Sequence, residues 1–431
     1  MEMRELAAQV KEASIELAAI GGEKKNAALA NIARDLWERR EEIIKANEAD
    51  LERSSREGLP EPLLKRLVFD QEKITDTVDG INSLIGLAEP VGQTVAATEL
   101  DEGLELFRVT CPIGVIGVIF ESRPDALVQI STLCLKSGNG VLLKGGSEAV
   151  ETNRILAEVI LRASVAAGLP EGWLRLLETR SEVSEMLGAD EFIDLVIPRG
   201  SNEFVRYIMD NSKIPVLGHA DGICHCYVDA QADLDMAVQV VFDSKTQYVA
   251  VCNATETLLV HEKAAAAFLP KLQEALAVKQ VELTGCPRTV ELIGVKAATD
   301  EDWGAEYLDY KMSIKVVSSL EEAIRHINRY GSGHTDSIIT ADKQAAAKFM
   351  SLVDAGNVYW NCSTRFSDGF RYGLGAEVGV STSKIHARGP VGLEGLLIYK
   401  YLLLGNGHIV DDYSERRKTF KHNRMDKGFP L

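Results

Sequence analysis

The sequence lacks the features of a membrane-spanning or secreted protein. The uncharged stretch at 109–120 covers only twelve residues, whereas a membrane-spanning helix needs about 20. The first residues include Glu2, Arg4 and Glu5, and no basic segment followed by an apolar one marks a secretion signal. The seven cysteines form no Cys-x-x-Cys pair. Because structural disulfides are typical of oxidising compartments, these absences predict reduced thiols and a cytoplasmic protein.

An excess of positive charge is also missing. The 431 residues include 47 Lys and Arg against 64 Asp and Glu, which gives a formal net charge of −17. Polyanions are bound by surfaces rich in Lys and Arg, so this balance argues against nucleic acid or an anionic membrane as a partner. The hydrophobic content of 46% is that of a folded globular chain, and the length predicts two or three domains.

Neither common nucleotide-binding fingerprint is present. No Gly-x-Gly-x-x-Gly follows a predicted strand, and no Gly-x-x-x-x-Gly-Lys-Ser/Thr occurs. Shorter glycine turns do follow predicted strands, at Gly145–Gly146 and at Gly200–Asn202. Backbone amides in such turns, together with a helix N-terminus, bind phosphate groups, although glycine also serves ordinary tight turns.

The order of hydrophobic patterns predicts an α/β protein. Residues 1 to about 90 place apolar side chains three and four positions apart, which predicts amphipathic helices. Short apolar strands then alternate with helical patterns, which predicts parallel sheets covered on both faces. We expect loop structure at 362–395 and a solvated extension at 411–431. The expected strands lie at 114–120, 141–144, 174–177, 195–197, 223–228, 257–261, 337–340 and 357–361, and the expected helices at 125–136, 147–167 (with Ser147 as N-cap), 233–244, 262–276, 320–328 and 342–352.

The tract Cys224-His225-Cys226 has the composition of a metal site, but its expected strand structure argues against one. Successive side chains of a strand point to opposite faces, so His225 would face away from Cys224 and Cys226. Two cysteines alone do not complete a tetrahedral zinc site. We therefore expect no metal.

Cys252 is the candidate nucleophile. It lies between a helical pattern and the strand expected at 257–261, a junction at which a side chain can face a cleft. A thiolate is a strong nucleophile, although a buried apolar role is commoner for cysteine. His219 and His261 leave a Cys–His hydrolase open as an alternative, since sequence spacing gives no geometry.

Eight short stretches between about residues 100 and 400 carry a family resemblance. They are Cys111–Pro124, Leu143–Gly146, Ile197–Asn202, Val251–Ala254, Glu306–Leu308, His326–His334, Asn361–Gly369 and His386–Leu393. In their order and combination they resemble the gamma-glutamyl phosphate reductases, or glutamate-5-semialdehyde dehydrogenases, of the aldehyde dehydrogenase superfamily. Each stretch is short, and it is the combination that is specific.

The resemblance implies an aldehyde dehydrogenase-like α/β fold in three parts. A Rossmann-like cofactor domain would cover 1–215, a catalytic α/β domain 216–390, and a C-terminal arm and tail 391–431. The resemblance also implies a β oligomerisation arm, Thr98–Cys111, paired with a segment near Leu396–Leu404. A homo-oligomer is therefore expected.

Roles of individual side chains also follow from the resemblance. Cys252 matches the catalytic thiol of the family. The cofactor, NADPH or NADP, would be bound by Lys144 at a ribose, by Gly146 and Ser147, by Gly200 and Ser201 beside the pyrophosphate, and by Glu306 at the nicotinamide ribose. The candidates for binding the amino-acid end of the substrate, each with loop packing as the alternative, are Ser363, Thr364, Arg365, His386 and Arg388.

Two positions depart from the hydrolytic members of the superfamily. Arg123 stands where those enzymes place an oxyanion-hole Asn, and Val216 stands where they place a general-base Glu. Without that base, water is not activated to hydrolyse a thioester. Arg123 is a candidate to donate to the thioester oxygen or to bind departing phosphate, with a structural ion pair as the alternative.

The resemblance thus implies a reductase that acts on an acyl phosphate. Cys252 would attack L-glutamyl 5-phosphate and expel phosphate, and hydride from NADPH would convert the thioester into L-glutamate 5-semialdehyde, on the route to proline. The alternatives are a coenzyme A-acylating aldehyde dehydrogenase and a cysteine hydrolase or acyltransferase.

Overall fold

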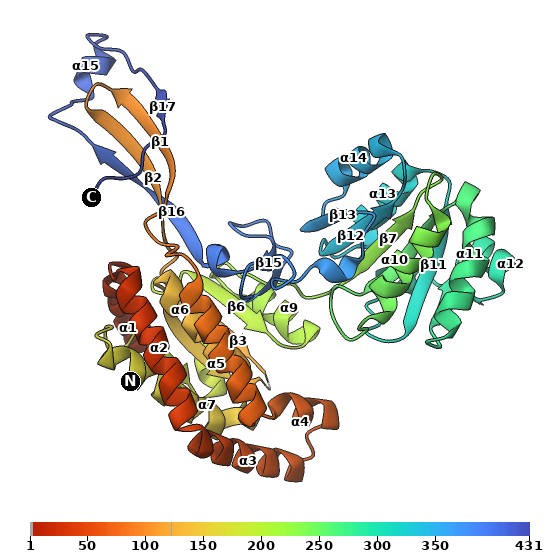
Figure 1. Ribbon diagram of the computed structural model, residues 1–431, viewed down its shortest axis with the longest axis horizontal. Helices are drawn as coiled ribbons and strands as arrows, with labels where there is room; N and C mark the ends of the chain where they lie inside the picture. Colours follow the sequence, from red (N-terminus) through yellow and green to blue (C-terminus); the bar gives the residue numbers. More distant parts are fainter. Residues whose placement is uncertain (1–2, 122) are drawn as a thin grey trace. The chain divides into compact units, whose positions relative to one another are not determined.

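The computed structural model describes residues 3–121 and 123–431, and the chain forms two compact units (Figure 1). Unit 1 comprises Met1–Gly200, Tyr207–Val216 and Val391–Leu431, and unit 2 comprises Ser201–Arg206 and Leu217–Pro390. Glu2 and Ser122, which belong to patterns discussed above, lie outside the described residues. No helix among the described residues is long and apolar enough to cross a membrane.

Amphipathic helices make up most of the first ninety residues, as predicted. Their apolar positions are buried, and Leu29, Ile32 and Leu36 are each at most 1% exposed. The side chain of Asp70 caps the last of these helices by accepting a hydrogen bond from the backbone N of Lys73. The helices are α1 (Met3–Ala18), α2 (Gly22–Glu38), α3 (Arg40–Arg56), α4 (Glu61–Leu67) and α5 (Gln71–Gly86).

Unit 1 contains a parallel sheet of four strands in the order β5-β4-β3-β6. Strands β3 and β4 are buried along their whole length, which is typical of a parallel sheet covered on both faces. The strands are β3 (Val115–Phe120), β4 (Gly140–Gly145), β5 (Leu174–Leu177) and β6 (Leu195–Arg199), and the helices that follow them are α6 (Pro124–Ser137), α7 (Val150–Ala166), α8 (Arg180–Leu187) and α9 (Asn202–Asn211).

The expected helix start at Ser147 is wrong. The chain first makes a 3₁₀ turn, η1 (Ser147–Ala149), and α7 begins only at Val150. The carboxylate of Asp50 in α3 explains this start, because it accepts hydrogen bonds from the backbone N and the hydroxyl of Thr152 at 2.8 and 2.7 Å. A buried carboxylate from another helix therefore satisfies the first turn of α7 in place of a serine cap.

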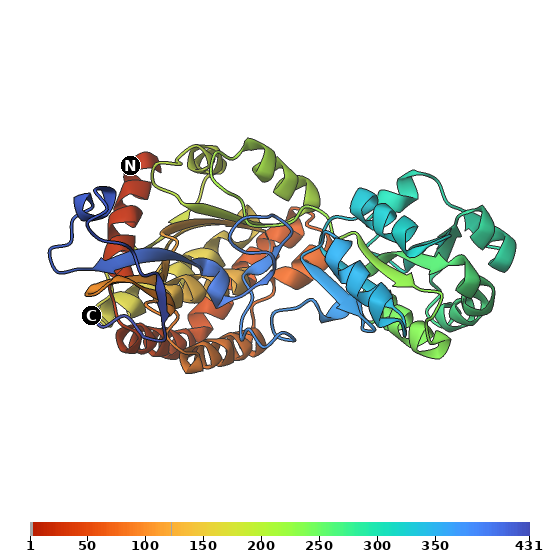
Figure 2. The ribbon, with the colours of Figure 1, turned by 90° about the horizontal axis from the view of Figure 1, so that it is seen from above.

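Unit 2 is built on a parallel sheet of seven strands in the order β10-β9-β11-β8-β7-β12-β13 (Figure 2). The sequence did not predict strands β9, β10 and β11. In β11 the apolar pattern is interrupted by Lys311 and Lys315. The strands are β7 (Cys224–Val228), β8 (Thr255–His261), β9 (Glu282–Gly285), β10 (Lys296–Ala297), β11 (Lys311–Val317), β12 (Thr335–Ile339) and β13 (Asn357–Trp360), and the helices are α10 (Leu234–Thr246), α11 (Glu262–Ala277), α12 (Pro287–Ile293), α13 (Leu320–Tyr330) and α14 (Lys343–Leu352).

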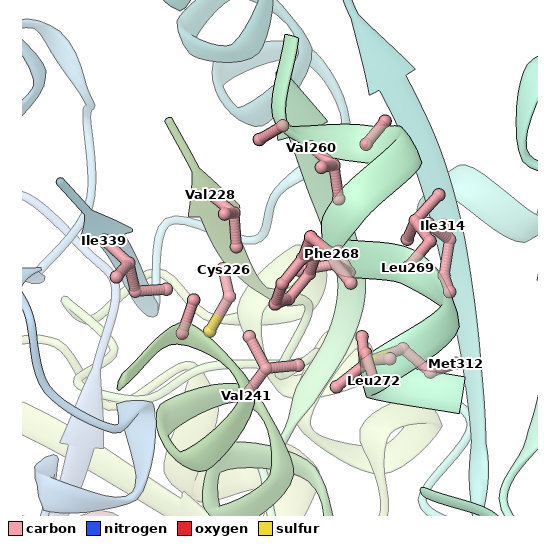
Figure 3. Packing of buried hydrophobic residues seen from close by; sticks show 14 of the residues in the cluster. Cys226, Val228, Val241, Val260, Phe268, Leu269, Leu272, Met312, Ile314 and Ile339 are labelled. Carbon is pink, nitrogen blue, oxygen red and sulfur yellow. The ribbon is translucent and has the colours of Figure 1, made fainter. Parts of the chain in front are cut away.

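Alternate residues of the central strands pack against different helices. Figure 3 shows Cys226 and Val228 of β7 in one core with Val241 of α10 and Phe268 of α11. Tyr227, between them in sequence, packs into a second core with residues of α13 and α14. His225 is therefore on the face opposite Cys224 and Cys226, as the strand pattern predicts.

The β1 and β2 hairpin forms an antiparallel arm with two C-terminal strands, in the order β16-β2-β1-β17. Leu397 pairs with Pro112 and Leu404 with Glu105, which confirms the expected strand pairing near Leu396–Leu404. The strands are β1 (Thr94–Asp101), β2 (Leu104–Pro112), β16 (Leu397–Leu404) and β17 (Asn423–Met425).

The C-terminal segment is mostly exposed to solvent, as expected, but it forms regular elements and pairs with the arm. The segment forms a short helix, α15 (Asp411–Ser414), and then β17 pairs with β1. Phe429 packs edge-on against Phe107 at 5.5 Å between ring centroids, and Lys427 pairs with Glu105 at 2.7 Å. The mixed charge of the tail thus complements charges on the arm.

The segment at 362–395 is largely loop, as expected. The short elements there are η3 (Thr364–Phe366), β14 (Gly379–Ser381), β15 (Gly389–Val391) and η4 (Leu393–Leu396), and a further 3₁₀ turn, η2 (Glu301–Gly304), precedes β11.

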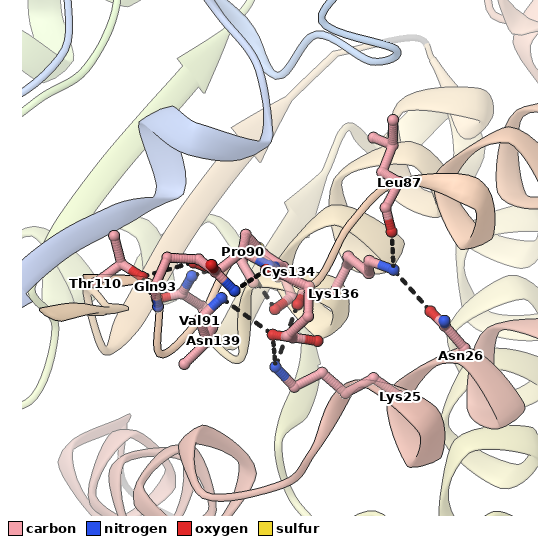
Figure 4. A network of polar contacts seen from close by, with 12 residues as sticks. Lys25, Asn26, Leu87, Pro90, Val91, Gln93, Thr110, Cys134, Lys136 and Asn139 are labelled. Carbon is pink, nitrogen blue, oxygen red and sulfur yellow. Dashed lines mark hydrogen bonds and ion pairs between the residues drawn. The ribbon is translucent and has the colours of Figure 1, made fainter. Parts of the chain in front are cut away.

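Two buried lysines tie the N-terminal helices of unit 1 to the helix that follows β3 (Figure 4). Lys25 Nζ is completely buried and pairs with Glu89 Oε1 at 2.7 Å. Lys136 Nζ donates to Asn26 Oδ1 at 2.7 Å and to Leu87 O at 2.9 Å. Burial lowers the pKa of Lys136, while the nearby Glu89 carboxylate acts against this shift. Each lysine therefore depends on acceptors held by a neighbouring element.

We expect Glu89→Gln to destabilise the protein, because it leaves the buried Lys25 ammonium without an opposite charge. Breaking a buried pair costs about 3–5 kcal/mol, and the partial exposure of Glu89 places the loss near about 3 kcal/mol. The control is Glu61→Gln, which removes an exposed pair with Lys65 and should change stability by less than about 0.5 kcal/mol. Urea unfolding followed by circular dichroism compares the two variants, and equal effects would contradict the assignment.

Candidate active site

The candidate nucleophile lies at the amino ends of three neighbouring strands of unit 2. In the order β8-β7-β12, Cys224 pairs with Thr255 and His225 with Asp336, so the three strands begin at the same level. Cys252 lies in the turn just before β8, and His334 lies just before β12. The topology therefore brings together residues from three separate loops.

The backbone at Gly222, just before β7, lies directly against the Cys252 turn. A Cβ added to Gly222 would lie 2.3 Å from Cys252 Cα and 2.3 Å from Cys252 O. These are backbone atoms that no side-chain rotation can move away. Only glycine at position 222 therefore allows the turn to occupy this place.

Hydrogen bonds from buried side chains hold the turn. Cys224 Sγ donates to Cys252 O at 3.1 Å, and Thr364 Oγ1 donates to Asn253 O at 2.7 Å. Asn253 Nδ2 in turn donates to Ser367 O at 2.7 Å. Burial raises the pKa of Cys224 well above its usual range, so this thiol keeps the proton that it donates.

Two histidines lie beside Cys252. Ligand atoms of Cys252, His219 and His334 all lie within 4.8 Å of one another, and the two rings meet edge-on at 5.0 Å between centroids. His219 Nδ1 lies 2.9 Å from Val380 O. Because a carbonyl can only accept, this nitrogen carries a proton in the neutral ring, and Nε2 is the proton acceptor.

His334 is 1% exposed, and its Nδ1 lies 2.8 Å from the hydroxyl of Thr335. Its Nε2 is buried and has no hydrogen-bond partner among the described residues. Sequence reasoning weighed His219 and His261, but His261 instead caps α11 by accepting from the backbone N of Lys263. His334 was missed because the signal lay only in its position, directly before a strand.

Ser363, Thr364 and Arg365 follow one another behind the turn. Ser363 and Thr364 are buried; Ser363 Oγ lies 3.1 Å from the hydroxyl of Ser244, while Thr364 bonds the turn itself. Arg365 Nε donates to Gln247 Oε1 at 2.9 Å. Burial lowers the pKa of Arg365, whereas the Cys252 thiol acts to raise it, so this cation is within electrostatic reach of the thiol.

A fully buried ion pair links the strand after Cys252 to the loop that carries Glu306. Lys245 Nζ lies 2.7 Å from Glu256 Oε2, and Glu256 Oε1 accepts from the backbone N of Leu308 at 3.2 Å. Burial raises the pKa of Glu256 to about 7, although the facing ammonium opposes the shift. Glu306 also accepts a hydrogen bond from Asn202, the neighbour of Ser201. The structure thus brings Glu306 close to the loop at Ser201 within unit 2.

The remaining cofactor candidates lie in unit 1, at the carboxyl edge of its sheet. Phe120 pairs with Gly145 and with Arg199, so β3, β4 and β6 end at the same level. Arg123, the Gly146–Ser147 turn and Gly200 follow these three ends. Lys144 is buried in β4, with its ammonium donating to Gly145 O. Carboxyl ends of parallel strands are the usual place for nucleotides in such sheets.

His386 and Arg388 lie in the loop between β14 and β15. His386 is exposed, whereas Arg388 pairs with Asp354 at 2.9 Å. Arg388 also lines a cavity of about 330 Å³ together with Gly331, Gly333 and Asp336. The positive charge of Arg388 is thus already paired with the carboxylate of Asp354 in the same unit.

Comparison with known proteins defines the class. The model of the aldehyde dehydrogenase family matches residues 1–285 and 312–388, and the chain belongs to this family. Its relatives include the gamma-glutamyl phosphate reductases of Acetivibrio thermocellus, 72% identical over 100% of both chains, and Pelotomaculum thermopropionicum, 70% identical over 100% of this chain and 99% of that one. The crystal structure of gamma-glutamyl phosphate reductase from Thermotoga maritima superposes with a TM-score of 0.93 at 44% identity, covering 95% of this chain and 100% of that chain. The resemblance stated from the sequence is confirmed.

We expect Gly222→Ala to displace the Cys252 turn, because the added methyl group would meet backbone atoms. The displaced thiol has different surroundings, and we expect iodoacetamide to alkylate Cys252 at a clearly altered rate. The control is Gly80→Ala in α5, where an added Cβ meets nothing within 4 Å. Peptide mapping of the alkylated cysteine measures both variants, and unchanged alkylation in Gly222→Ala would show that the close approach is dispensable.

Proposed function

We propose that this chain reduces L-glutamyl 5-phosphate to L-glutamate 5-semialdehyde and phosphate with NADPH, through a thioester on Cys252, as a step of proline biosynthesis. The observation that carries the proposal is the Cys252 turn, held by buried hydrogen bonds with two histidines beside the thiol. The 72% identity to a gamma-glutamyl phosphate reductase over the full chain supports this substrate.

Two regions suit a nicotinamide cofactor. In unit 1, Gly146 directly follows the carboxyl end of β4, the kind of sheet edge at which nucleotides commonly bind. We assign Lys144, Gly146, Ser147, Gly200 and Ser201 to the phosphate and ribose groups, and Glu306 to the hydroxyls of the nicotinamide ribose. When bound, the cofactor supplies the hydride that reduces the thioester carbonyl.

Activation of the thiol falls to His219. Its Nδ1–H is held by the Val380 carbonyl, so Nε2 accepts the proton of Cys252 and the imidazolium can later return it. The thiolate attacks the acyl carbon, the bond to the phosphate oxygen breaks, and phosphate leaves.

The thioester is protected from hydrolysis because the chain has no carboxylate at position 216. Val216 carries no carboxylate, so no side chain at this position takes a proton from water. We assign Arg123 to the departing phosphate and to the thioester oxygen, for which a fixed guanidinium is suited. In the reverse direction, the acyl group therefore waits for phosphate rather than for water.

The substrate's amino-acid end needs a cation for its carboxylate. We assign Arg365 to this role, with His386 and Arg388 contributing from the loop before β15. Ser363 and Thr364 support substrate binding indirectly. The Ser363 hydroxyl is hydrogen-bonded to that of Ser244, and the Thr364 hydroxyl donates to Asn253 O in the Cys252 turn.

We further propose a cytoplasmic homo-oligomer that assembles through the arm. All seven cysteines are free, which suits a reducing compartment. Strand β16 is an edge strand of the arm, and Tyr399, Tyr401 and Leu403 on it are 49%, 60% and 55% exposed. Exposed apolar side chains on an unpaired edge are typical of a surface that joins a second chain.

The direct test runs the reaction in reverse, from glutamate semialdehyde and NADP. We expect continued NADPH formation only when phosphate is present, with arsenate as a substitute, because Val216 supplies no carboxylate base for water. Cys252→Ser should lower turnover by about 10⁴-fold or more, since the nucleophile is removed. The matched control is Cys286→Ser, which should retain activity. The absorbance of NADPH measures the activity of the wild-type protein and of both variants.

Sustained NADPH production in phosphate-free buffer, with free glutamate as product, would contradict the proposal. A requirement for coenzyme A in place of phosphate would identify a coenzyme A-acylating dehydrogenase. Failure of the protein to bind any nicotinamide nucleotide would favour a cysteine hydrolase or acyltransferase.

A further inference from the structure

The three groups beside the Cys252 turn have the composition and spacing of a thiophilic metal site. In a tetrahedral zinc site with Zn–N and Zn–S bonds of about 2.1 and 2.3 Å, neighbouring ligand atoms lie about 3.4–3.7 Å apart. The ligand atoms of Cys252, His219 and His334 lie within 4.8 Å of one another. The difference is on the order of 1 Å, and Cys252 and His219 are only half-buried, whereas His334 is buried.

Contacts around the two histidines match those of metal ligands. Metal-binding imidazoles usually hydrogen-bond through the ring nitrogen that does not face the metal, which fixes the ring. His219 Nδ1 is held by the Val380 carbonyl, and His334 Nδ1 is held by the hydroxyl of Thr335. His334 Nδ1 also lies 3.8 Å from Cys224 Sγ. In both rings Nδ1 has a hydrogen-bond partner, so Nε2 is the nitrogen suited to a metal.

The buried Nε2 of His334 is a second, independent observation. It has no hydrogen-bond partner among the described residues, in a side chain that is 1% exposed. A buried polar atom of this kind is unfavourable unless something satisfies it. A cation shared with the Cys252 thiolate would satisfy it.

We propose that Cys252, His219 and His334 bind a divalent thiophilic cation such as Zn²⁺, with water as the fourth ligand. Binding displaces the thiol proton of Cys252, and the sulfur–metal bond occupies the electron pair with which the thiolate attacks. The cation is therefore a reversible inhibitor and not a cofactor; this consequence rests on the proposed function, whereas the binding does not. The site differs from the Cys224–Cys226 tract, for which the sequence predicts no metal.

Charges around the cluster limit its affinity. The guanidinium of Arg365 acts on the Cys252 thiol and opposes a cation, and Cys224 stays protonated and adds no charge. With one thiolate and two neutral imidazoles, the site has three protein ligands. This set is that of exchangeable zinc sites rather than of closed structural ones.

Cobalt(II) is a direct probe, because a cobalt–thiolate bond absorbs in the near ultraviolet. We expect chelator-treated full-length protein to show this band with one equivalent of Co²⁺, and Zn²⁺ to displace it. Cys252→Ser should abolish the band. His219→Ala and His334→Gln should each weaken cobalt binding at least about tenfold. The controls are Cys286→Ser and His422→Ala, which remove a thiol and an exposed imidazole outside the cluster.

Inhibition is measured on the same proteins. Zn²⁺ should inhibit the wild-type enzyme reversibly, with recovery on adding EDTA, and His334→Gln should need at least about tenfold more Zn²⁺ for half inhibition. Absence of the cobalt band, or its persistence in Cys252→Ser, would overturn the proposal. His219 is half-buried, so His219→Ala gives a folded test if the buried His334 does not tolerate substitution. A cobalt band without reductase activity would overturn the proposed function and leave the metal site standing.

Discussion

The missing side chain at Gly222 is the constraint on which the candidate active site depends. It lets the backbone before β7 lie against the Cys252 turn at a distance that no Cβ would allow. The turn is also fixed by hydrogen bonds from the Thr364 hydroxyl and the Cys224 thiol. A nucleophile in an irregular turn thereby gains a defined position, which is what covalent catalysis requires.

The position of the site in the sheet explains how its parts meet. Parallel pairing of β8, β7 and β12 aligns their amino ends, so loops far apart in sequence deliver Cys252 and His334 to one place. The glycine turns of unit 1 occupy the opposite kind of edge, the carboxyl ends of β3, β4 and β6. Each unit therefore presents a different sheet edge: one suited to a thiol and its histidines, and one suited to a dinucleotide.

Local patterns predicted the elements, and the resemblance predicted the roles. Apolar periodicity was enough for the N-terminal helices and for most strands of the two parallel sheets, since these signals are local, but not for β9, β10 and β11. It failed at Ser147, where a carboxylate from α3 overrides the local cap, and it gave no sign that the exposed C-terminal tail pairs with the arm. The position of His334 beside Cys252 could not be predicted either. It follows from the order of the strands in the sheet, which spacing along the chain does not encode. Thr364 was singled out as a substrate ligand, yet its hydroxyl is bonded to Asn253 O, a contact that only the fold creates.

In the proposed reaction Cys252 carries the acyl group, which can be trapped. Enzyme is mixed with glutamate semialdehyde and NADP in phosphate-free buffer, quenched in acid, digested and weighed by mass spectrometry. We expect one glutamyl group on the peptide that contains Cys252, and its release by hydroxylamine, as for a thioester. An unmodified Cys252 peptide, or a glutamyl group on any other cysteine, would contradict it.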